Sequence, residues 1–297
     1  MSQAVLITGA SGGIGQALVK AIAGKGYTVY AGVRGEAEVL AGMPGVRTVT
    51  LDVTDSDSVA AAAEQVGRDL RDQGLRAVIN NAGVIVQGPL EIVPPAELRR
   101  QFEVNTYGPV FVTQAFLPLL RTGGGRVINI SAATARQPVP FLAPLAGSKA
   151  ALASMSTALR MELAAWDIPV VLIEPGSTAT AIFDKAATAA EAALALADPG
   201  RAALYAEHLA AVAKATARRR HASTEPVVRT VTTALEARKP KRVYVVPGDA
   251  RLLGLLSRLP APLRERLISG TLGLTGVQAG KSTPSNGSLS TTRDRSR

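Results

Sequence analysis

A glycine-rich turn directly after the first apolar strand constrains this chain more than any other feature. Residues 8–15 read Thr-Gly-Ala-Ser-Gly-Gly-Ile-Gly, between a predicted strand at 5–8 and a predicted helix at 14–24. Glycines in such a turn let the backbone approach a phosphate group, and the helix N-terminus offers free N–H groups and a positive dipole. The turn therefore predicts a bound dinucleotide. The predicted contacts are Gly9, Ser11, Gly12, Gly13, Ile14 and Gly15.

Seven short apolar segments alternate with longer segments of helical period. The short segments are rich in Val and Ile, which predicts strands buried on both faces of a parallel sheet. They cover residues 5–8, 28–32, 46–51, 77–80, 126–130, 170–174 and 242–245. The predicted helices cover residues 14–24, 56–73, 96–120 and 147–165. The pattern favours an α/β fold, a Rossmann-type doubly wound parallel sheet of about seven strands, as one domain over residues 1–250.

Three segments depart from this alternation. Residues 178–221 are alanine-rich and longer than a simple crossover, so we expect a small helical substrate lobe above the carboxyl edge of the sheet. Residues 251–279 mix leucines, arginines and prolines. We expect them to form an extension packed on the domain, with a weak surface anchor as the alternative. Residues 280–297 have few large apolar side chains and are predicted to be a disordered tail.

The composition argues against several kinds of site. The chain has no cysteine and only two histidines, His208 and His221, so we expect neither disulfides nor a metal site. The net charge of +10 is concentrated in residues 214–242 and 281–297 without interleaved aromatics, which indicates solvated basic surface rather than a nucleic-acid interface. No apolar run is long enough to span a bilayer, and we expect no leader segment and a cytoplasmic location.

The end of the second predicted strand indicates which dinucleotide is bound. Arg34 lies 19 residues after Gly15, near the position where a carboxylate binds the ribose hydroxyls in NAD-preferring domains. A guanidinium suits a 2′-phosphate instead. We therefore expect NADP(H), with NAD(H) as the alternative because Glu36 lies close by.

Several motifs together resemble the short-chain dehydrogenase/reductase family over about residues 3–250. The turn at 8–15 is similar to its TGxxxGxG motif, and further motifs follow in the family's order. They are Asp52-Val53, Asn80-Asn81-Ala82-Gly83, Asn105, Lys149, and Pro175-Gly176 with Thr178 and Thr180.

This resemblance implies a role for each matching position. Asp52 would contact the adenine, and Asn81, Ala82 and Gly83 would lie beside the cofactor. Asn105 would support a proton-relay water, and Lys149 would bind the nicotinamide ribose. The loop over residues 175–180 would hold the carboxamide.

Two positions depart from the family's pattern. The resemblance puts the catalytic tyrosine at Leu145, four residues before Lys149, and the catalytic serine at Ala132. Leucine cannot donate a proton, and losing a positioned general acid costs about 10²–10⁴-fold in rate. Ordinary ketone reduction by the family mechanism is therefore expected to be severely impaired.

Three functions remain open. The first is an oxidoreductase that transfers hydride to a small apolar substrate needing no tyrosine acid, such as an imine, an iminium ion or an activated alkene. The second is a non-redox isomerase, cyclase or lyase that keeps NADP(H) as a bound element. The third is a cofactor-binding pseudoenzyme. The retained Lys149, Asn105 and Thr180 favour the first, because they would orient a nicotinamide.

Other polar side chains are candidates for the missing proton donor. Ser131 is nearest in sequence, but strand alternation is expected to point it away from the side that Ala132 faces. The other candidates each have a packing or surface role as the alternative. They are Tyr107, Arg136, Gln137, Tyr205 and His208.

The long predicted helices at 96–120 and 147–165 indicate the assembly state. Small residues along the second helix permit close approach of another helix. In the family these two helices build a dimer interface, so the resemblance implies a homodimer or homotetramer.

Overall fold

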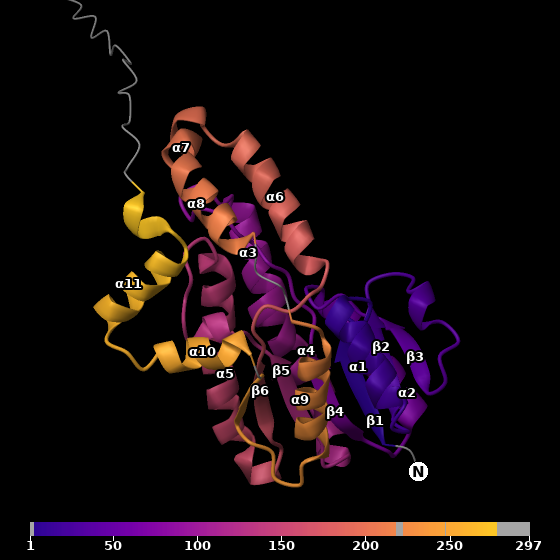
Figure 1. Ribbon diagram of the computed structural model, residues 1–297. Helices are drawn as coiled ribbons and strands as arrows, with labels where there is room; N and C mark the ends of the chain where they lie inside the picture. Colours follow the sequence, from indigo (N-terminus) through magenta and orange to yellow (C-terminus); the bar gives the residue numbers. More distant parts are fainter. Residues whose placement is uncertain (1–2, 218–221, 247, 278–297) are drawn as a thin grey trace, which may run out of the picture.

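Seven parallel strands form one sheet in the order β3-β2-β1-β4-β5-β6-β7 (Figure 1). The computed structural model describes residues 3–217, 222–246 and 248–277. The strand order reverses between β1 (Ala4–Thr8) and β4 (Leu75–Asn80). The carboxyl ends of these two strands therefore flank the crevice where doubly wound sheets bind ligands. The predicted fold class is confirmed.

The remaining elements follow in regular alternation until residue 180. The other strands are β2 (Thr28–Val33), β3 (Val46–Thr50), β5 (Arg126–Ile130), β6 (Val170–Glu174) and β7 (Val243–Val245). The helices are α1 (Gly13–Ala23), α2 (Ser56–Leu70), α3 (Pro95–Phe102), α4 (Gly108–Thr122), α5 (Ala143–Glu162), α6 (Ile182–Leu196), α7 (Pro199–Leu204), α8 (Ala206–Thr216), α9 (Glu225–Glu236), α10 (Asp249–Leu256) and α11 (Ala261–Thr271). The predicted strands agree with the observed ones to within two residues at each end.

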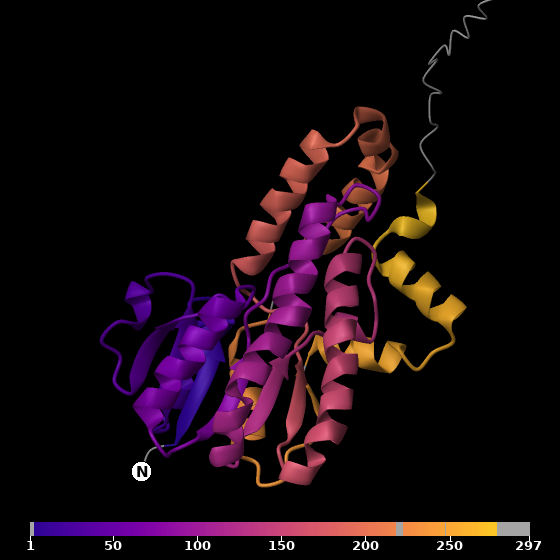
Figure 2. The same ribbon diagram turned by 180° about the vertical axis from the view of Figure 1, so that it is seen from behind.

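Helices cover both faces of the sheet (Figures 1 and 2). Helices α1 and α9 pack on one face, and α2, α4 and α5 pack on the other. Successive residues of β1 point to opposite faces: Val5 joins the first core cluster and Leu6 the second. Burial on both faces explains why the strands read as continuous apolar runs.

Two helical features differ from the sequence expectation. Helix α9 was not predicted, because its β-branched residues lower helix propensity; its buried stripe, including Val227, Val231 and Leu235, nevertheless packs on the sheet. The single helix expected at 96–120 is interrupted by a π-helical turn, η2 (Glu103–Tyr107). Pro109 follows that turn and lacks the N–H that a regular α-helix would use there.

Helices α6, α7 and α8 rise above the carboxyl edge of the sheet as a separate lobe (Figure 1). The two ends of the lobe meet where the Ala179 N–H donates to the Ala222 carbonyl at 2.7 Å and the Ala222 N–H donates to the Ser177 carbonyl at 3.0 Å. Of the residues in these three helices, only Ala186 is buried. The lobe is therefore attached by few buried contacts.

The chain after β7 runs from the sheet to the lobe. Helix α10 contacts β7 and the short helix η3 (Ala133–Ala135), and η5 (Leu274–Gly276) contacts α8. Ile268 and Leu272 are buried on the inner side of this extension. The predicted disordered tail at 280–297 lies outside the described residues.

Candidate functional site

The glycine-rich turn exposes an uncapped helix N-terminus at the carboxyl end of β1. Helix α1 begins at Gly13, and its N-cap, Gly12, provides no side-chain hydrogen bond. Gly9 has a φ of 62°, and a Cβ there would lie 2.7 Å from the Cα of Ala82. A Cβ on Gly15 would overlap the Gly9 carbonyl oxygen. The turn thus requires glycine, and a helix N-terminus of this kind suits an anionic group such as a phosphate.

The segment after β4 is hydrogen-bonded to this turn. The Thr8 Oγ1 accepts the N–H groups of Asn81 and Ala82, each at 3.0 Å. The Asn81 Nδ2 donates to the carbonyls of Thr8 at 3.0 Å and Gly9 at 3.1 Å. These bonds hold the Asn81-Ala82-Gly83 segment, which we expect beside the cofactor, against the glycine-rich turn. The Asn81 side chain stabilises the turn itself, which is a structural role.

The loop after β6 reaches the same turn from the other side. A Cβ on Gly13 would lie 2.8 Å from the Thr180 Cγ2, so this loop packs directly on the glycines. Thr178 is buried, and its Oγ1 donates to the Gly176 carbonyl at 3.4 Å. The Pro175 carbonyl accepts an N–H from η3. The structure therefore brings together three segments that are far apart in sequence.

The adenine side of the crevice lies at the ends of β2 and β3. The Asp52 Oδ1 accepts the Thr54 N–H at 2.9 Å and the Thr54 hydroxyl at 2.8 Å. Val53 is buried against Gly108 of α4. Arg34, directly after β2, is exposed. In the glycine-rich turn, Ser11 is also exposed, whereas Ile14 packs against the core. An exposed guanidinium at this end of the crevice can reach an anionic group.

Lys149 lies buried in α5, beside the segment that follows β4. Its Nζ donates to the Ile130 carbonyl at 2.7 Å, and a Cβ on Gly83 would lie 3.9 Å from that Nζ. Burial lowers the pKa of the Lys149 ammonium to about 8. An ammonium has three N–H donors, and one is bonded to a carbonyl in the described part of the chain. The remaining donors fit ribose hydroxyls of a dinucleotide.

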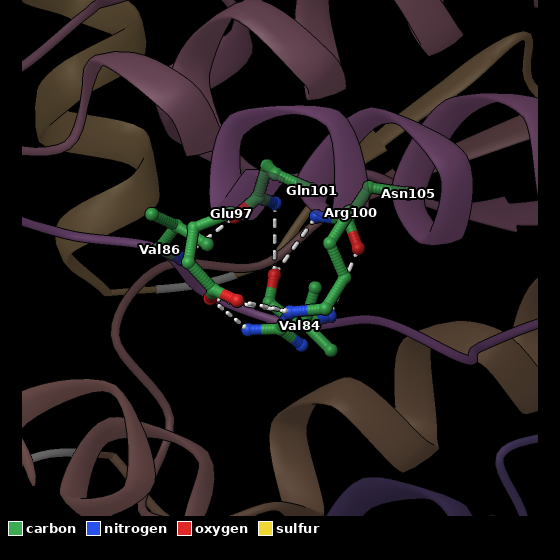
Figure 3. Close-up of polar contacts among 6 residues, drawn as sticks. All are labelled: Val84, Val86, Glu97, Arg100, Gln101 and Asn105. Carbon is green, nitrogen blue, oxygen red and sulfur yellow. Dashed lines mark hydrogen bonds and ion pairs between the residues drawn. The ribbon is translucent and has the colours of Figure 1, made fainter. Parts of the chain in front are cut away.

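Two buried amide side chains hold the segment after β4 from the opposite side (Figure 3). The Asn105 Oδ1 accepts the Val84 N–H and its Nδ2 donates to the Val84 carbonyl, both at 2.9 Å. The Gln101 Oε1 accepts the Val86 N–H at 2.6 Å, and its Nε2 donates to the Val84 carbonyl at 2.9 Å and the Ser148 Oγ at 3.2 Å. This arrangement fixes an extended segment that has no neighbouring strand there.

Sequence reasoning found Asn105 but missed Gln101. Gln101 and Asn105 are four residues apart and lie on the same side of continuous helical structure. Two amide side chains at this spacing were the sequence pattern that could have revealed Gln101. Beside them, Glu97 and Arg100 form a half-exposed ion pair at 2.6 Å. The Asn105 side chain bonds to Val84 and also donates to the Ser148 Oγ at 3.5 Å, and its expected role in a proton relay stays a prediction.

The expected tyrosine position is filled by an apolar contact. Leu145 is 8% exposed and clusters with Ile85, from the segment after β4, and with Ala186 of the lobe helix α6. Three partly buried side chains pack against this cluster: Leu142, Ile182 and Phe183. Ala132 is half-buried directly after β5. Neither side chain can donate a proton, and Ala186 of α6 packs against Leu145.

The other candidate donors differ in their contacts, and the buried Nδ1 of His208 has no hydrogen-bond partner among the described residues. Ser131 is buried, and its Oγ donates to the Lys149 carbonyl at 3.5 Å. Tyr107 is exposed and stacks on Phe111. The Tyr205 hydroxyl donates to Glu91 at 2.8 Å, a bond that raises the pKa of Tyr205. His208 lies beside the Tyr205 ring.

Arg136 and Gln137 differ in their surroundings. Arg136 pairs with Glu174 at 2.9 Å. Burial raises the pKa of that carboxyl, and Arg136 partly opposes the shift. Gln137 is buried, so a surface-loop role is wrong for it. Its Oε1 has no hydrogen-bond partner in the described structure.

Residues 3–217, 222–246 and 248–277 contain neither a metal-binding cluster nor a membrane-spanning helix. In these ranges, no group of three or more His, Asp or Glu side chains could hold a metal ion. None of the helices in the same ranges combines the length and hydropathy needed to cross a membrane.

Known proteins resemble this chain in sequence. A family model described as short chain dehydrogenase matches residues 3–191. Estradiol 17-beta-dehydrogenase 2 of Rattus norvegicus is 40% identical over 189 residues, 61% of this chain and 49% of that protein. The NADPH-dependent 3-dehydrocapnine reductase of Ornithobacterium rhinotracheale is 34% identical over 252 residues, 81% of this chain and 87% of that protein. The chain thus spans about half the length of the first relative and most of the second.

Solved structures match over more of the chain. A short chain dehydrogenase from Burkholderia cenocepacia J2315, crystallised in complex with NADP, is similar with a TM-score of 0.71 and 27% sequence identity. The match covers 90% of this chain and 97% of that one.

Proposed function

The chain belongs to the short-chain dehydrogenase family, and we propose that it is an NADP(H)-dependent reductase whose substrate needs no tyrosine acid. The proposed substrates are small apolar imines or iminium ions, or activated alkenes. One observation carries the proposal. Leu145 is buried under the lobe at the tyrosine position, whereas the cofactor-side residues, including Lys149 and Asn105, are retained and positioned.

The described residues fit NADP(H). The free N–H groups at the start of α1 suit the pyrophosphate, and the exposed Arg34 suits a 2′-phosphate. Lys149 would bind the nicotinamide ribose, and the loop with Thr180 would hold the carboxamide. The NADP in the Burkholderia relative and the NADPH dependence of the Ornithobacterium reductase support this cofactor. When bound, the cofactor supplies the hydride.

The chemistry of the substrate replaces the missing acid. A neutral imine first takes a proton from water and becomes an iminium ion. The iminium carbon then accepts hydride while the C=N electron pair moves to nitrogen, which gives a neutral amine without an acid from the protein. An activated alkene accepts hydride at the β-carbon and takes its proton from water. The apolar wall formed by Leu145, Ile85 and Phe183 would bind an apolar substrate without competing for hydrogen bonds.

A substrate panel with NADPH tests this function. Cyclic imines, iminium ions, enones and ketones of matched size are each mixed with the enzyme, and nicotinamide absorbance is followed together with product formation. We expect turnover of imines or enones and little turnover of ketones. Faster ketone reduction would contradict the proposal. Product formation at constant absorbance would indicate the non-redox alternative instead, and cofactor binding without any product would indicate a pseudoenzyme.

Leu145→Met is the matched control for the panel. It keeps the volume and apolar character of the side chain, so imine turnover is expected to persist within a few fold. A large loss of turnover in this variant would show that a more specific property of Leu145 is required.

The choice between NADP(H) and NAD(H) is tested with Arg34→Asp. A charge-assisted contact to the 2′-phosphate contributes about 1.5–3 kcal/mol, so NADPH affinity should fall roughly tenfold to hundredfold relative to NADH. Arg238→Asp, at an exposed position after α9, is the charge-matched control. Calorimetric titration of both variants measures the ratio. An unchanged ratio in Arg34→Asp removes this role.

We also propose that the protein is at least a dimer. Helices α4 and α5 lie side by side on one face (Figure 2). They expose Phe111 and Met155, and Tyr107, just before α4, stacks on Phe111. Light scattering of the purified protein tests this proposal, and a monomeric mass would reject it.

A further inference from the structure

Four exposed leucines lie outside the candidate site, two on α10 and two on α11. Leu252 and Leu255 are 60% and 61% exposed and three residues apart. Leu263 and Leu267 are 48% and 42% exposed and four residues apart. Each pair therefore shares one side of its helix. We call these four residues the leucine face. Scattered exposed leucines are ordinary, but a set of this density indicates an interaction surface.

The leucine face is not the side by which the extension packs on the protein. Ile268 and Leu272 are buried in α11 and just after it, and Ala250 is buried in α10. Helix α10 contacts η3 and β7, and η5 contacts α8. Helix α11 lies at the outer edge of the molecule in both views, and α10 runs from it towards the sheet (Figures 1 and 2). The inner side is thus packed while the outer leucines remain exposed.

Arginines adjoin the leucine face in the sequence. Residues 251–272 contain four arginines and one glutamate. Arg251, Arg258 and Arg266 are exposed, and Arg264 is half-buried. The whole chain carries a net charge of +10, so its long-range field also favours an anionic partner.

We propose that the leucine face docks on the surface of an anionic lipid bilayer. Helices with leucines on one side and arginines beside them bind at the boundary between headgroups and acyl chains. In that position the leucines enter the apolar layer while the arginines contact anionic headgroups. The same chemistry explains why these leucines are not covered by the protein itself.

A second copy of the chain fits this surface less well. A symmetric dimer places the same patch against itself. Here the exposed Arg251, Arg258 and Arg266 would face one another, with Glu265 the single acidic residue at 251–272. Like charges facing each other across an interface are unfavourable. An anionic bilayer satisfies the leucines and the arginines together.

Vesicle flotation of the full-length protein tests the proposal. Vesicles of phosphatidylcholine with phosphatidylglycerol are compared with vesicles of phosphatidylcholine alone, at low and high sodium chloride. We expect flotation with the anionic vesicles and its reduction by salt, because surface charges are screened over a Debye length. Failure of the wild-type protein to float with anionic vesicles at low salt overturns the proposal.

Matched variants then locate the contact. Changing all four leucines of the face to Ser should abolish flotation, whereas Val39→Ser with Met161→Ser, at exposed apolar positions elsewhere, should leave it intact. Changing Arg251, Arg258 and Arg266 to Gln should weaken binding by about fivefold per arginine. Circular dichroism shows that each variant remains folded.

Two outcomes of these variants contradict the proposal. Equal loss of flotation in the control pair would show that the leucine face is not the contact. A fall in oligomeric mass in the leucine variant, with flotation retained, would show that a second copy covers the face.

Discussion

The cofactor side and the lobe side of the site are built in opposite ways. On the cofactor side, the buried Thr8 and Gln101 and the half-buried Asn81 fix the backbone through hydrogen bonds between 2.6 and 3.1 Å. On the lobe side, α6 packs against Leu145 and Ile85 in an apolar cluster. Hydrogen bonds are directional and define one geometry, whereas apolar contacts are non-directional and tolerate changes in shape. The comparison suggests a fixed cofactor beside an adaptable substrate pocket without an acid.

The largest effect is expected from adding the missing groups to the lobe side. Leu145→Tyr with Ala132→Ser should raise ketone reduction by about 10²–10⁴-fold, because a positioned general acid contributes that much. Leu145→Phe with Ala132→Ser supplies the same ring without the hydroxyl and should give no such gain. NADPH oxidation with a ketone substrate measures both. An equal gain in the two variants would mean that proton donation is not what the site lacks.

A smaller but severe effect is expected from crowding the cofactor side. In Gly15→Ala the new methyl meets the Gly9 carbonyl, so the turn must open, at a cost of about 3 kcal/mol. Gly67→Ala in α2 is the control, since its methyl meets only the Leu119 Cδ2 at 3.9 Å and alanine favours the helix. Denaturation and NADPH titration measure the difference. Unchanged cofactor affinity in Gly15→Ala would show that the turn does not bind the phosphates.

The buried ammonium of Lys149 predicts a pH dependence of stability in the cofactor-free protein. Its pKa is about 8 in the folded state and about 10.5 in the unfolded state. Between these values the unfolded chain binds more protons, so stability rises with pH as the folded lysine loses its proton. The gain from pH 8 to pH 10 is about 2 kcal/mol. In Lys149→Met the rise in stability between pH 8 and pH 10 should be absent. Thermal unfolding of both proteins across this pH range measures the difference.

The smallest effect is expected at the amide pair that holds the segment after β4. Gln101→Leu leaves the buried Val86 N–H without its acceptor, which costs about 1–2 kcal/mol of stability. The neighbouring change Arg100→Gln breaks only a half-exposed ion pair and should cost under about 0.5 kcal/mol. Urea denaturation compares the two. Equal costs would show that Gln101 contributes no more than a surface contact.

Local sequence signals predicted some parts of the site better than others. The turn with Gly9 and Gly15 was predicted because its backbone demands act within a few residues. Gln101 was missed because its role depends on Val84 and Val86, which meet it only in the folded chain. The buried position of Gln137 also depends on packing from elements distant in sequence. The catalytic assignments at Lys149 and Asn105 stay predictions.

By itself, the sequence determined the fold class, the glycine turn and the absence of a hydroxyl at Leu145 and Ala132. These features follow from residue types and from short-range periodicity, which one chain segment carries alone. The tertiary structure decided what surrounds Leu145, the position where the family resemblance leads us to expect the tyrosine. Leu145 is covered by Ala186 of the lobe, 41 residues away, and that contact exists only because the sheet and α6 meet. It also decided that the leucines of α10 and α11 remain outside, because the inner side of that extension already packs on the protein through Ile268 and Leu272.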